Sequence, residues 1–253
     1  NELARKNLWN ILKSIEVSRA EKIPLCQAPG HAPLFFVEVG DGVKVDYRLV
    51  DALKEAVRGA TQRGFLRPSI VDAVTRENTG DNTARYYPAV HVDLVSGRDW
   101  VDLYVVHKAG PAPIKGIYFE DMGPNMEAVV EYVLQNVVSI GAYLCPPLFL
   151  TVAIGGMSDM CMRESARALL RPIGSRNPNP KLAKLEERIL EAVNQLGVGA
   201  GGMGGDVTAL DVWVEADGTY LYIAGVANHI QCWPIRRGRA RIYRDESFEI
   251  EVY

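Results

Sequence analysis

Four cysteines are the residues whose types and settings most readily suggest chemistry in this 253-residue chain. Three of them lie beside prolines, at breaks between the helices and strands that the sequence predicts. These are Cys26, before Gln27-Ala28-Pro29-Gly30, Cys145, before Pro146-Pro147, and Cys232, before Trp233-Pro234. Loops can direct thiolates to one point in space, and three protein ligands would leave one iron of a 4Fe-4S cluster open. An open iron can act as a Lewis acid on a substrate hydroxyl and carboxylate.

A second interpretation treats the cysteines as small hydrophobic residues, which free cysteines often are. Cys161, on an expected helix between Met160 and Met162, fits this description. Spacing alone does not show that the other three cysteines meet, so both interpretations stay open for them. No C-x-x-C pair occurs, which disfavours a zinc ribbon or thioredoxin-like chemistry.

Other catalytic patterns are missing from the sequence. The four histidines lack the H-x-x-x-H spacing of zinc enzymes. His91 and His107 fall in expected strands, whereas His31 lies close to Cys26 and is a candidate functional residue. There is no G-x-S-x-G elbow and no phosphate-binding loop. Glycines 197, 199 and 202 match G-x-G-x-x-G, but they follow an expected helix and precede a strand, the reverse of a dinucleotide site.

Apolar periodicity predicts that helices and strands alternate along the chain and position these residues. The expected helices cover about residues 1–20, 47–57, 125–142, 158–170 and 180–196, and the expected strands cover 34–39, 89–95, 101–107, 148–154, a run ending at 215, and 220–227. Asn179 is expected to cap the last helix and Gly197 to end it. Residues 96–99 are expected to join their flanking strands as a hairpin. The interleaving favours an α/β (mixed α+β) fold with a mixed sheet, as one large domain over residues 1–253.

Composition excludes several classes of protein. Lys and Arg number 28 against 31 Asp and Glu, and the resulting charge of −3 disfavours a nucleic-acid binder. Hydrophobic residues make up 48% of the chain, enough for a sizeable core. No apolar run reaches the roughly 18 residues of a membrane span. Four scattered cysteines are too few for a secreted disulfide framework, so we expect a soluble, cytoplasmic protein.

Several blocks of sequence occur in an order and spacing that point to one family. They are Cys26-Gln27 with Gly30, Leu66-Arg67, Asn78-Thr79-Gly80-Asp81-Asn82, Cys145-Pro146-Pro147, residues 171–181, residues 196–205, and Gln231-Cys232-Trp233 with Arg236-Arg237. Through them the chain resembles, over nearly its full length, the alpha subunit or N-terminal domain of the iron-sulfur hydro-lyases. This family comprises class I fumarase and L-tartrate dehydratase. The block at residues 171–181 is closest to the tartrate dehydratase branch.

The resemblance implies a site and a reaction. Cys26, Cys145 and Cys232 would be the three ligands of a 4Fe-4S cluster whose fourth iron binds substrate. Gln27, Arg67 and Gly110 would bind a hydroxy(di)carboxylic acid, and a guanidinium suits a carboxylate because the two pair bidentately. The glycine-rich residues 197–205 would let the backbone approach the site. The implied reaction is reversible hydration of a carbon–carbon double bond, as with fumarate and malate, tartrate or a related acid.

Two segments depart from the family pattern. The first motif normally reads Cys-Gln-Asp-Thr-Gly, and Ala28 and Pro29 here replace the aspartate and threonine. This change removes an acid–base group. The family's Gly-Gly-Gly-Ser loop is changed to Ala-Gly-Pro-Ala at residues 109–112. Both changes make the expected pocket less polar, and one hypothesis is that His31 replaces the lost aspartate as proton carrier.

The resemblance also implies a partner. In this family the catalytic threonine and further substrate-binding arginine and lysine belong to a beta subunit or C-terminal domain. The chain resembles the alpha half, so we expect a separate beta-type subunit and an alpha2beta2 assembly. The alternative from another class is a noncatalytic or redox-sensing paralogue that retains the iron-sulfur cluster. The lost aspartate is the feature that favours this alternative.

Overall fold

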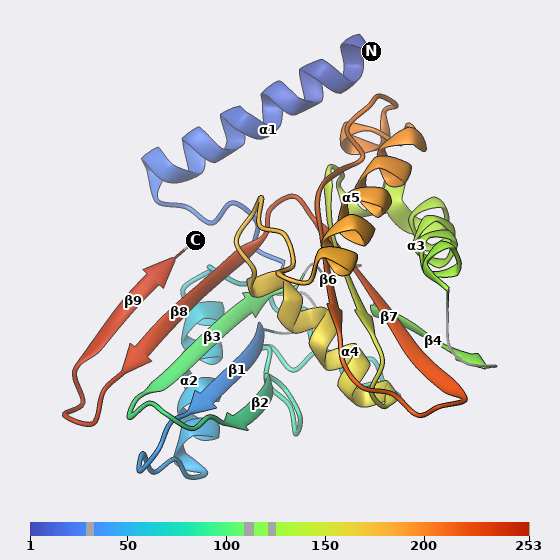
Figure 1. Cartoon of the computed structure of the whole chain (residues 1–253). Coiled ribbons are helices and arrows are strands. Elements are labelled where there is room, and N and C mark those ends of the chain that lie inside the picture. The colour runs from blue at the N-terminus through green and yellow to red at the C-terminus, as the bar shows by residue number, and fades with distance from the viewer. Residues whose placement is uncertain (29–32, 109–113, 121–124, 253) are drawn as a thin grey trace. The chain divides into compact units, whose positions relative to one another are not determined.

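The computed structural model describes residues 1–28, 33–108, 114–120 and 125–252, with residues 114–120 described by their backbone alone. The chain divides into two compact units (Figure 1). Unit 1 comprises Asn1–Glu16 and Pro111–Trp233, and unit 2 comprises Val17–Gly110 and Pro234–Tyr253. Helix α1 (Glu2–Glu21) begins in unit 1 and ends in unit 2. Each unit combines helices with a mixed sheet, which confirms the predicted α/β class, while one domain over residues 1–253 stays a prediction.

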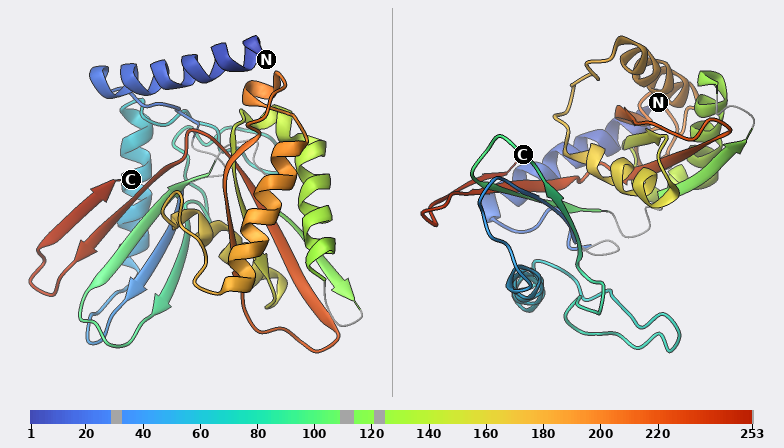
Figure 2. Two further views of the ribbon diagram at one scale, coloured as in Figure 1. Left: turned by 45° about the horizontal axis from the view of Figure 1, so that its top comes forward. Right: turned by 60° about the horizontal axis from the view of Figure 1, so that its bottom comes forward.

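Unit 2 is built on a five-stranded sheet with the order β2-β1-β3-β8-β9. Its elements are β1 (Pro33–Val39), α2 (Arg48–Gln62), β2 (Ala89–Leu94), β3 (Val101–His107), β8 (Arg236–Ile242) and β9 (Phe248–Val252). Strand β1 is parallel to β2, and the remaining neighbours are antiparallel. Helix α2 packs on one face of this sheet, where Leu53 and Val57 form a buried cluster with Phe35 of β1 (Figure 2). The apolar spacing that predicts this helix therefore faces the core.

The predicted hairpin between residues 89–95 and 101–107 is wrong. Both strands form, but β1 lies between them and pairs with each. The burial of the strands gives the physical reason. Strand β1 is buried along almost its whole length, which suits an interior position, whereas β2 is half exposed and occupies the edge of the sheet.

Unit 1 is built on a four-stranded sheet with the order β4-β7-β5-β6. Its strands are β4 (Ile114–Glu120), β5 (Leu148–Ile154), β6 (Ala209–Ala216) and β7 (Ile223–Cys232). Its remaining helices are α3 (Met126–Ile140), η1 (Gly141–Leu144), α4 (Ser158–Arg167), η2 (Ala168–Leu170), α5 (Pro180–Gln195) and η3 (Ala200–Gly202). Asn179 caps α5 as predicted, because its side chain accepts a hydrogen bond from the Lys181 N–H at 3.0 Å.

Helices lie on opposite faces of the unit 1 sheet. Ala153 of β5 packs against Cys161 of α4. The next residue position belongs to the other face, where Asn228 of β7, the partner of Val152, accepts a hydrogen bond from Asn136 of α3 at 3.4 Å. This alternation explains why β5 reads as a continuous apolar run, since both of its faces are covered.

Three strands were not predicted from the sequence: β4, β8 and β9. Strand β7 also extends to Cys232, beyond the expected end near residue 227. Cys232 is therefore the last residue of a strand rather than part of a loop. Across residues 1–28, 33–108, 114–120 and 125–252, no helix has both the length and the apolar character needed to cross a membrane.

Candidate functional site

Cys145 and Cys232 lie at the same end of the unit 1 sheet. Cys232 pairs with Leu148, so the end of β7 adjoins the start of β5. Cys145 lies three residues before Leu148, and its carbonyl accepts a hydrogen bond from the Trp233 N–H at 3.5 Å. Cys145 is exposed, Cys232 is buried, and neither forms a disulfide. The antiparallel pairing of β5 and β7 thus brings together two of the three cysteines proposed as ligands.

The glycine-rich segment at residues 197–205 is held beside Cys145. The Gly201 N–H donates to the Pro146 carbonyl at 2.7 Å, and the Gly199 N–H donates to the Thr208 hydroxyl at 3.1 Å. Gly202 lies against Ala142, because a Cβ added at Gly202 would be 3.2 Å from the Ala142 Cβ. Glycine therefore permits the backbone of this loop to pack closely against residues near Cys145. The segment follows α5 and precedes β6, which disfavours a dinucleotide site as expected.

The segment containing Cys26 belongs to unit 2, where three successive backbone carbonyls each accept a hydrogen bond. The Arg236 guanidinium donates from Nη1 to the Cys26 carbonyl and from Nη2 to the Ala28 carbonyl. The carbonyl between them, that of Gln27, accepts a hydrogen bond from the Arg67 N–H at 2.8 Å. Cys26 itself is half-buried and its thiol is free. Residues far apart in the sequence thus fix three successive peptide units of the first motif.

Gln27 and Arg67, the residues proposed to bind substrate, are neighbours within unit 2. Both side chains are exposed, and the Gln27 Nε2 donates to the Gly64 carbonyl at 2.6 Å. The turn that carries Arg67 therefore accepts a hydrogen bond from the Gln27 side chain and donates one to the Gln27 carbonyl. Exposure leaves the Arg67 guanidinium accessible to an anionic ligand.

Asn82 holds the turn around Arg67. In the sequence it stands out only as the last residue of the motif at residues 78–82. Its side chain is fully buried. The Nδ2 atom donates to the Arg67 carbonyl at 3.0 Å and to the Thr61 hydroxyl at 2.9 Å. The Oδ1 atom accepts hydrogen bonds from the N–H groups of Ser69 at 2.8 Å and Ile70 at 3.3 Å. One buried amide thus ties α2 to the turn, a role that only the tertiary structure reveals.

The block at residues 171–181 has a structural role in unit 1. Arg171 donates to the buried Glu186 carboxylate at 2.7 Å and to Glu215 at 3.0 Å. The other Glu186 oxygen accepts a hydrogen bond from the Asn177 N–H at 2.9 Å, and Asn177 Nδ2 donates to the Val214 carbonyl at 2.8 Å. These contacts fasten α5 to β6. The block that looks closest to the tartrate dehydratase branch is therefore engaged in packing.

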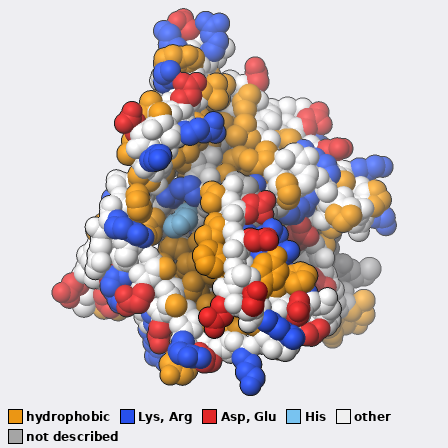
Figure 3. Space-filling model, turned by 90° about the vertical axis from the view of Figure 1, so that its left-hand side faces the viewer, with side chains coloured by type: hydrophobic (Ala, Val, Ile, Leu, Met, Phe, Trp, Pro, Cys, Tyr) orange, Lys and Arg blue, Asp and Glu red, His pale blue; other side chains and the backbone are white. Residues whose placement is uncertain are grey.

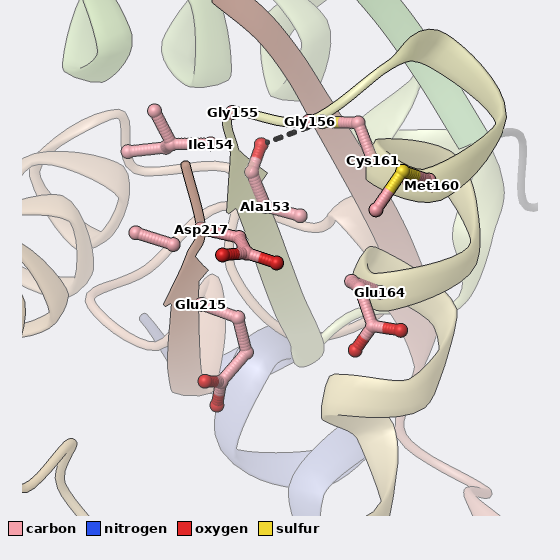
Figure 4. A pocket seen from close by; sticks show the side chains of 10 residues that line it. Ala153, Ile154, Gly155, Gly156, Met160, Cys161, Glu164, Glu215 and Asp217 are labelled. Atoms are coloured by element: carbon pink, nitrogen blue, oxygen red, sulfur yellow. Dashed lines mark hydrogen bonds between the residues drawn. The ribbon is translucent and has the colours of Figure 1, made fainter. Parts of the chain in front are cut away.

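Cys161 lies apart from the other two cysteines of unit 1, under a small pocket lined by carboxylates (Figure 4). Its Sγ donates to the Ala153 carbonyl at 3.1 Å, and burial raises the pKa of this thiol to about 11. Both observations confirm the expectation that Cys161 is a core residue. Glu164, Glu215 and Asp217 surround the pocket, and Glu215 is paired with Arg171.

The three histidines that the structure describes lie among packed side chains of the two sheets. His91 stacks on Phe36 with ring centroids 5.1 Å apart, and His229 is fully buried. His107 lines a hollow of unit 2 with Arg236 and several apolar side chains. Burial, together with the nearby charge of Arg236, lowers the pKa of His107 to about 4. Figure 3 shows hydrophobic, basic and histidine side chains meeting at a hollow on one face.

Two candidate residues, His31 and Gly110, lie outside the described residues. Among the side chains that the structure does describe, no group of three or more His, Cys, Asp or Glu residues is placed to hold a metal ion. Cys26 belongs to unit 2, whereas Cys145 and Cys232 belong to unit 1. Three cysteines outside any disulfide, each next to a backbone segment held by hydrogen bonds, are a donor set suited to an iron-sulfur cluster.

Comparison with known proteins defines the class of this protein. Residues 1–241 match the fumarate hydratase (Fumerase) family. The chain therefore belongs to this family of hydro-lyases, as its sequence motifs predict.

Individual relatives refine the comparison. The chain is 32% identical over 249 residues to a protein of Methanocaldococcus jannaschii named "Putative L(+)-tartrate dehydratase subunit alpha", covering 97% of the chain and 87% of the relative. It is 35% identical over 241 residues to the L(+)-tartrate dehydratase subunit alpha of Escherichia coli strain UTI89. The corresponding protein of strain K12 is 34% identical over the same length. Each match to these two proteins covers 95% of the chain and 78% of the relative.

Proposed function

We propose that the chain is the alpha subunit of a two-subunit, 4Fe-4S-dependent hydro-lyase that acts on a hydroxy(di)carboxylic acid. The observation that carries the proposal is the match to tartrate dehydratase alpha subunits over nearly the whole chain. Fumarate and malate, tartrate or a related acid fall within this substrate class. The word alpha in the relatives' names supports a separate beta-type subunit, and we propose an alpha2beta2 assembly.

Cys26, Cys145 and Cys232 are the proposed ligands of the cluster. The pairing of β5 with β7, which brings Cys145 and Cys232 to one end of a sheet, supports this assignment. When bound, the cluster would supply an open iron that acts as a Lewis acid toward the substrate hydroxyl. Replacing any one ligand with serine should abolish iron binding. Cys161→Ser should retain iron, because the Cys161 thiol donates a hydrogen bond to the Ala153 carbonyl and is not a proposed ligand. Iron retained by the three ligand variants would contradict the assignment.

The protein groups proposed to act on substrate are Gln27, Arg67 and Gly110. Arg67 is the group whose charge would bind a carboxylate, and its exposed side chain lies on a turn fixed by buried hydrogen bonds. Ala28 supplies no proton carrier where the family has an aspartate. We therefore propose His31 as a candidate for that role, tested by His31→Asn, which should abolish turnover while leaving the cluster in place.

The activity is tested by preparing the chain anaerobically with a beta-type subunit and measuring hydration and dehydration across a panel of hydroxy acids. Turnover of at least one dicarboxylic hydroxy acid, lost in Cys145→Ser, is the expected result. Cluster binding without turnover of any acid in the panel would favour the noncatalytic or redox-sensing alternative. Ala28, in the aspartate position of the family motif, is the residue that favours that alternative.

A further inference from the structure

We propose that Arg236 is a positioning residue that fixes the direction of the Cys26 thiol by holding the peptide units on both sides of Gln27. The inference rests on the proposed role of Cys26 as a cluster ligand. Its basis is the pair of hydrogen bonds from one guanidinium to the carbonyls of Cys26 and Ala28.

The anchor of Arg236 is rigid. Arg236 is the first residue of β8, and it pairs with His107 at the end of β3 in the interior of the five-stranded sheet. Its side chain is only partly exposed, so the guanidinium is held in place by its surroundings. A donor on a sheet strand transmits the geometry of the sheet to whatever accepts its hydrogen bonds.

The segment that receives these bonds has no regular structure of its own. Pro24 and Pro29 flank it in the sequence, and neither helix nor strand covers residues 23–28. Its order therefore depends on donors from elsewhere in unit 2. Arg236 supplies two of them, and the Arg67 N–H supplies the third, to the Gln27 carbonyl. Loss of Arg236 should loosen the peptide units on both sides of the Gln27 carbonyl, which the Arg67 N–H still holds.

Arginine is the residue type that this arrangement requires. A planar guanidinium presents parallel donors in a fixed fork, so one side chain can bond two carbonyls that are two residues apart. A lysine at position 236 keeps the charge but has a compact ammonium on a flexible stem. Lysine therefore separates the effect of charge from the effect of the fork.

The test compares Arg236→Lys with Arg239→Lys, a matched control on the same strand. Arg239 forms an ion pair with Glu251 at 3.0 Å and does not bond the Cys26 segment. The first measurement is hydrogen exchange in the metal-free full chain, read at the Arg67 amide, which bonds the Gln27 carbonyl. We expect about tenfold faster exchange in Arg236→Lys, because a hydrogen bond from a charged donor shifts an opening equilibrium by about that factor or more. Amides of β3 and α2 should exchange as in the unchanged protein.

The second measurement is the rate of iron loss to a chelator from the cluster-loaded complex, which should rise about tenfold in Arg236→Lys for the same reason. Arg236→Gln, which retains an amide donor, should give intermediate values in both measurements. Unchanged exchange at Arg67 in both Arg236 variants would overturn the proposal. Equal acceleration throughout β3 and α2 would also overturn it, since that result indicates a general stabilising role.

Different results would overturn the proposed function and the positioning role of Arg236. If the unchanged protein binds no iron, the proposed function fails, while the exchange measurement still decides whether Arg236 positions the Cys26 segment. If the unchanged protein binds iron and Arg236→Lys releases it at the same rate, the positioning role fails and the proposed function stands.

Discussion

At the scale of residues, buried polar side chains set the geometry of the proposed site. Asn82 satisfies the Arg67 carbonyl and two N–H groups with one amide. Arg67 in turn bonds the Gln27 carbonyl. The proposed substrate arginine and the first cysteine motif are therefore parts of one hydrogen-bonded arrangement in unit 2.

Replacing Asn82 tests this arrangement. Asn82→Ala should lower the free energy of unfolding by about 2–3 kcal/mol, because it leaves buried backbone groups without partners. Asn78→Ala, an exposed asparagine of the same motif, should lower it by only about 0.5 kcal/mol. Denaturant titration measures both values, and equal losses in the two variants would contradict the role assigned to Asn82.

The sequence predicts the burial of Cys161 correctly, from its place on an expected helix between Met160 and Met162. It does not show which cysteines meet. Cys145 and Cys232 come close because β5 pairs with β7, and these two strands are separated in the chain by several helices and by β6. Likewise, the motif containing Asn82 is visible as a block, but its role depends on contacts with Thr61 of α2.

At the scale of elements, the glycine-rich loop after α5 combines positive φ angles with close packing. Gly197 and Gly199 both have φ of 67°. A Cβ at Gly199 would lie 2.2 Å from the Gly204 carbonyl carbon, whereas a Cβ at Gly197 would have no atom within 4 Å. The two positions therefore share a positive φ and differ in steric room, and Gly199 also has a ψ of 175°, a combination found almost only in glycine.

Alanine substitutions should separate these two effects. Gly197→Ala should destabilise the protein by about 1 kcal/mol, from the left-handed backbone conformation alone. Gly199→Ala adds a clash with backbone and should destabilise it by about 3 kcal/mol in total. Thermal unfolding followed by circular dichroism provides the comparison, and a Gly199→Ala variant as stable as Gly197→Ala would show that the loop is not held as described.

Elements with strong apolar periodicity were predictable from the sequence, and elements stabilised by tertiary ion pairs were not. Helix α5, with its cap and regular apolar face, matches its prediction closely. Strand β8 carries arginines at positions 236, 237, 239 and 241, which do not resemble a strand pattern. It forms because its arginines find partners in neighbouring strands, such as Asp102 for Arg241 at 2.9 Å.

At the scale of the whole molecule, each unit joins segments from distant parts of the chain. In unit 2, Asp102 of β3 binds side chains of the neighbouring strand β8, which comes from near the C-terminal end of the chain. Its carboxylate is fully buried and accepts hydrogen bonds from Arg241, Arg98 and the Trp100 ring N–H. Burial alone would raise the pKa of Asp102. The hydrogen bonds from Arg241 and Trp100 and the charges of Arg241 and Arg98 outweigh it and hold the pKa below its ordinary value of 3.8.

This lowered pKa predicts the pH dependence of stability. Because the folded-state pKa lies below the unfolded value, Asp102 stabilises the fold fully above pH 3.8 and loses that contribution as pH falls through the folded-state pKa. Asp102→Asn should destabilise the protein by about 3 kcal/mol at neutral pH. It should also flatten the acid limb of the stability profile, which is the fall in the free energy of unfolding at low pH. Asp99→Asn, at an exposed position nearby, is the control. An acid limb unchanged in Asp102→Asn would contradict the prediction.

We propose that this chain provides three cysteine ligands to a cluster with one open iron. Mössbauer spectroscopy of the anaerobic, iron-57-loaded complex with a beta-type subunit tests it most directly, before and after addition of a hydroxydicarboxylic acid. We expect a 4Fe-4S spectrum in which one iron site changes when the acid binds. Absence of cluster iron, or a spectrum in which no site responds to any acid of the panel, would contradict it.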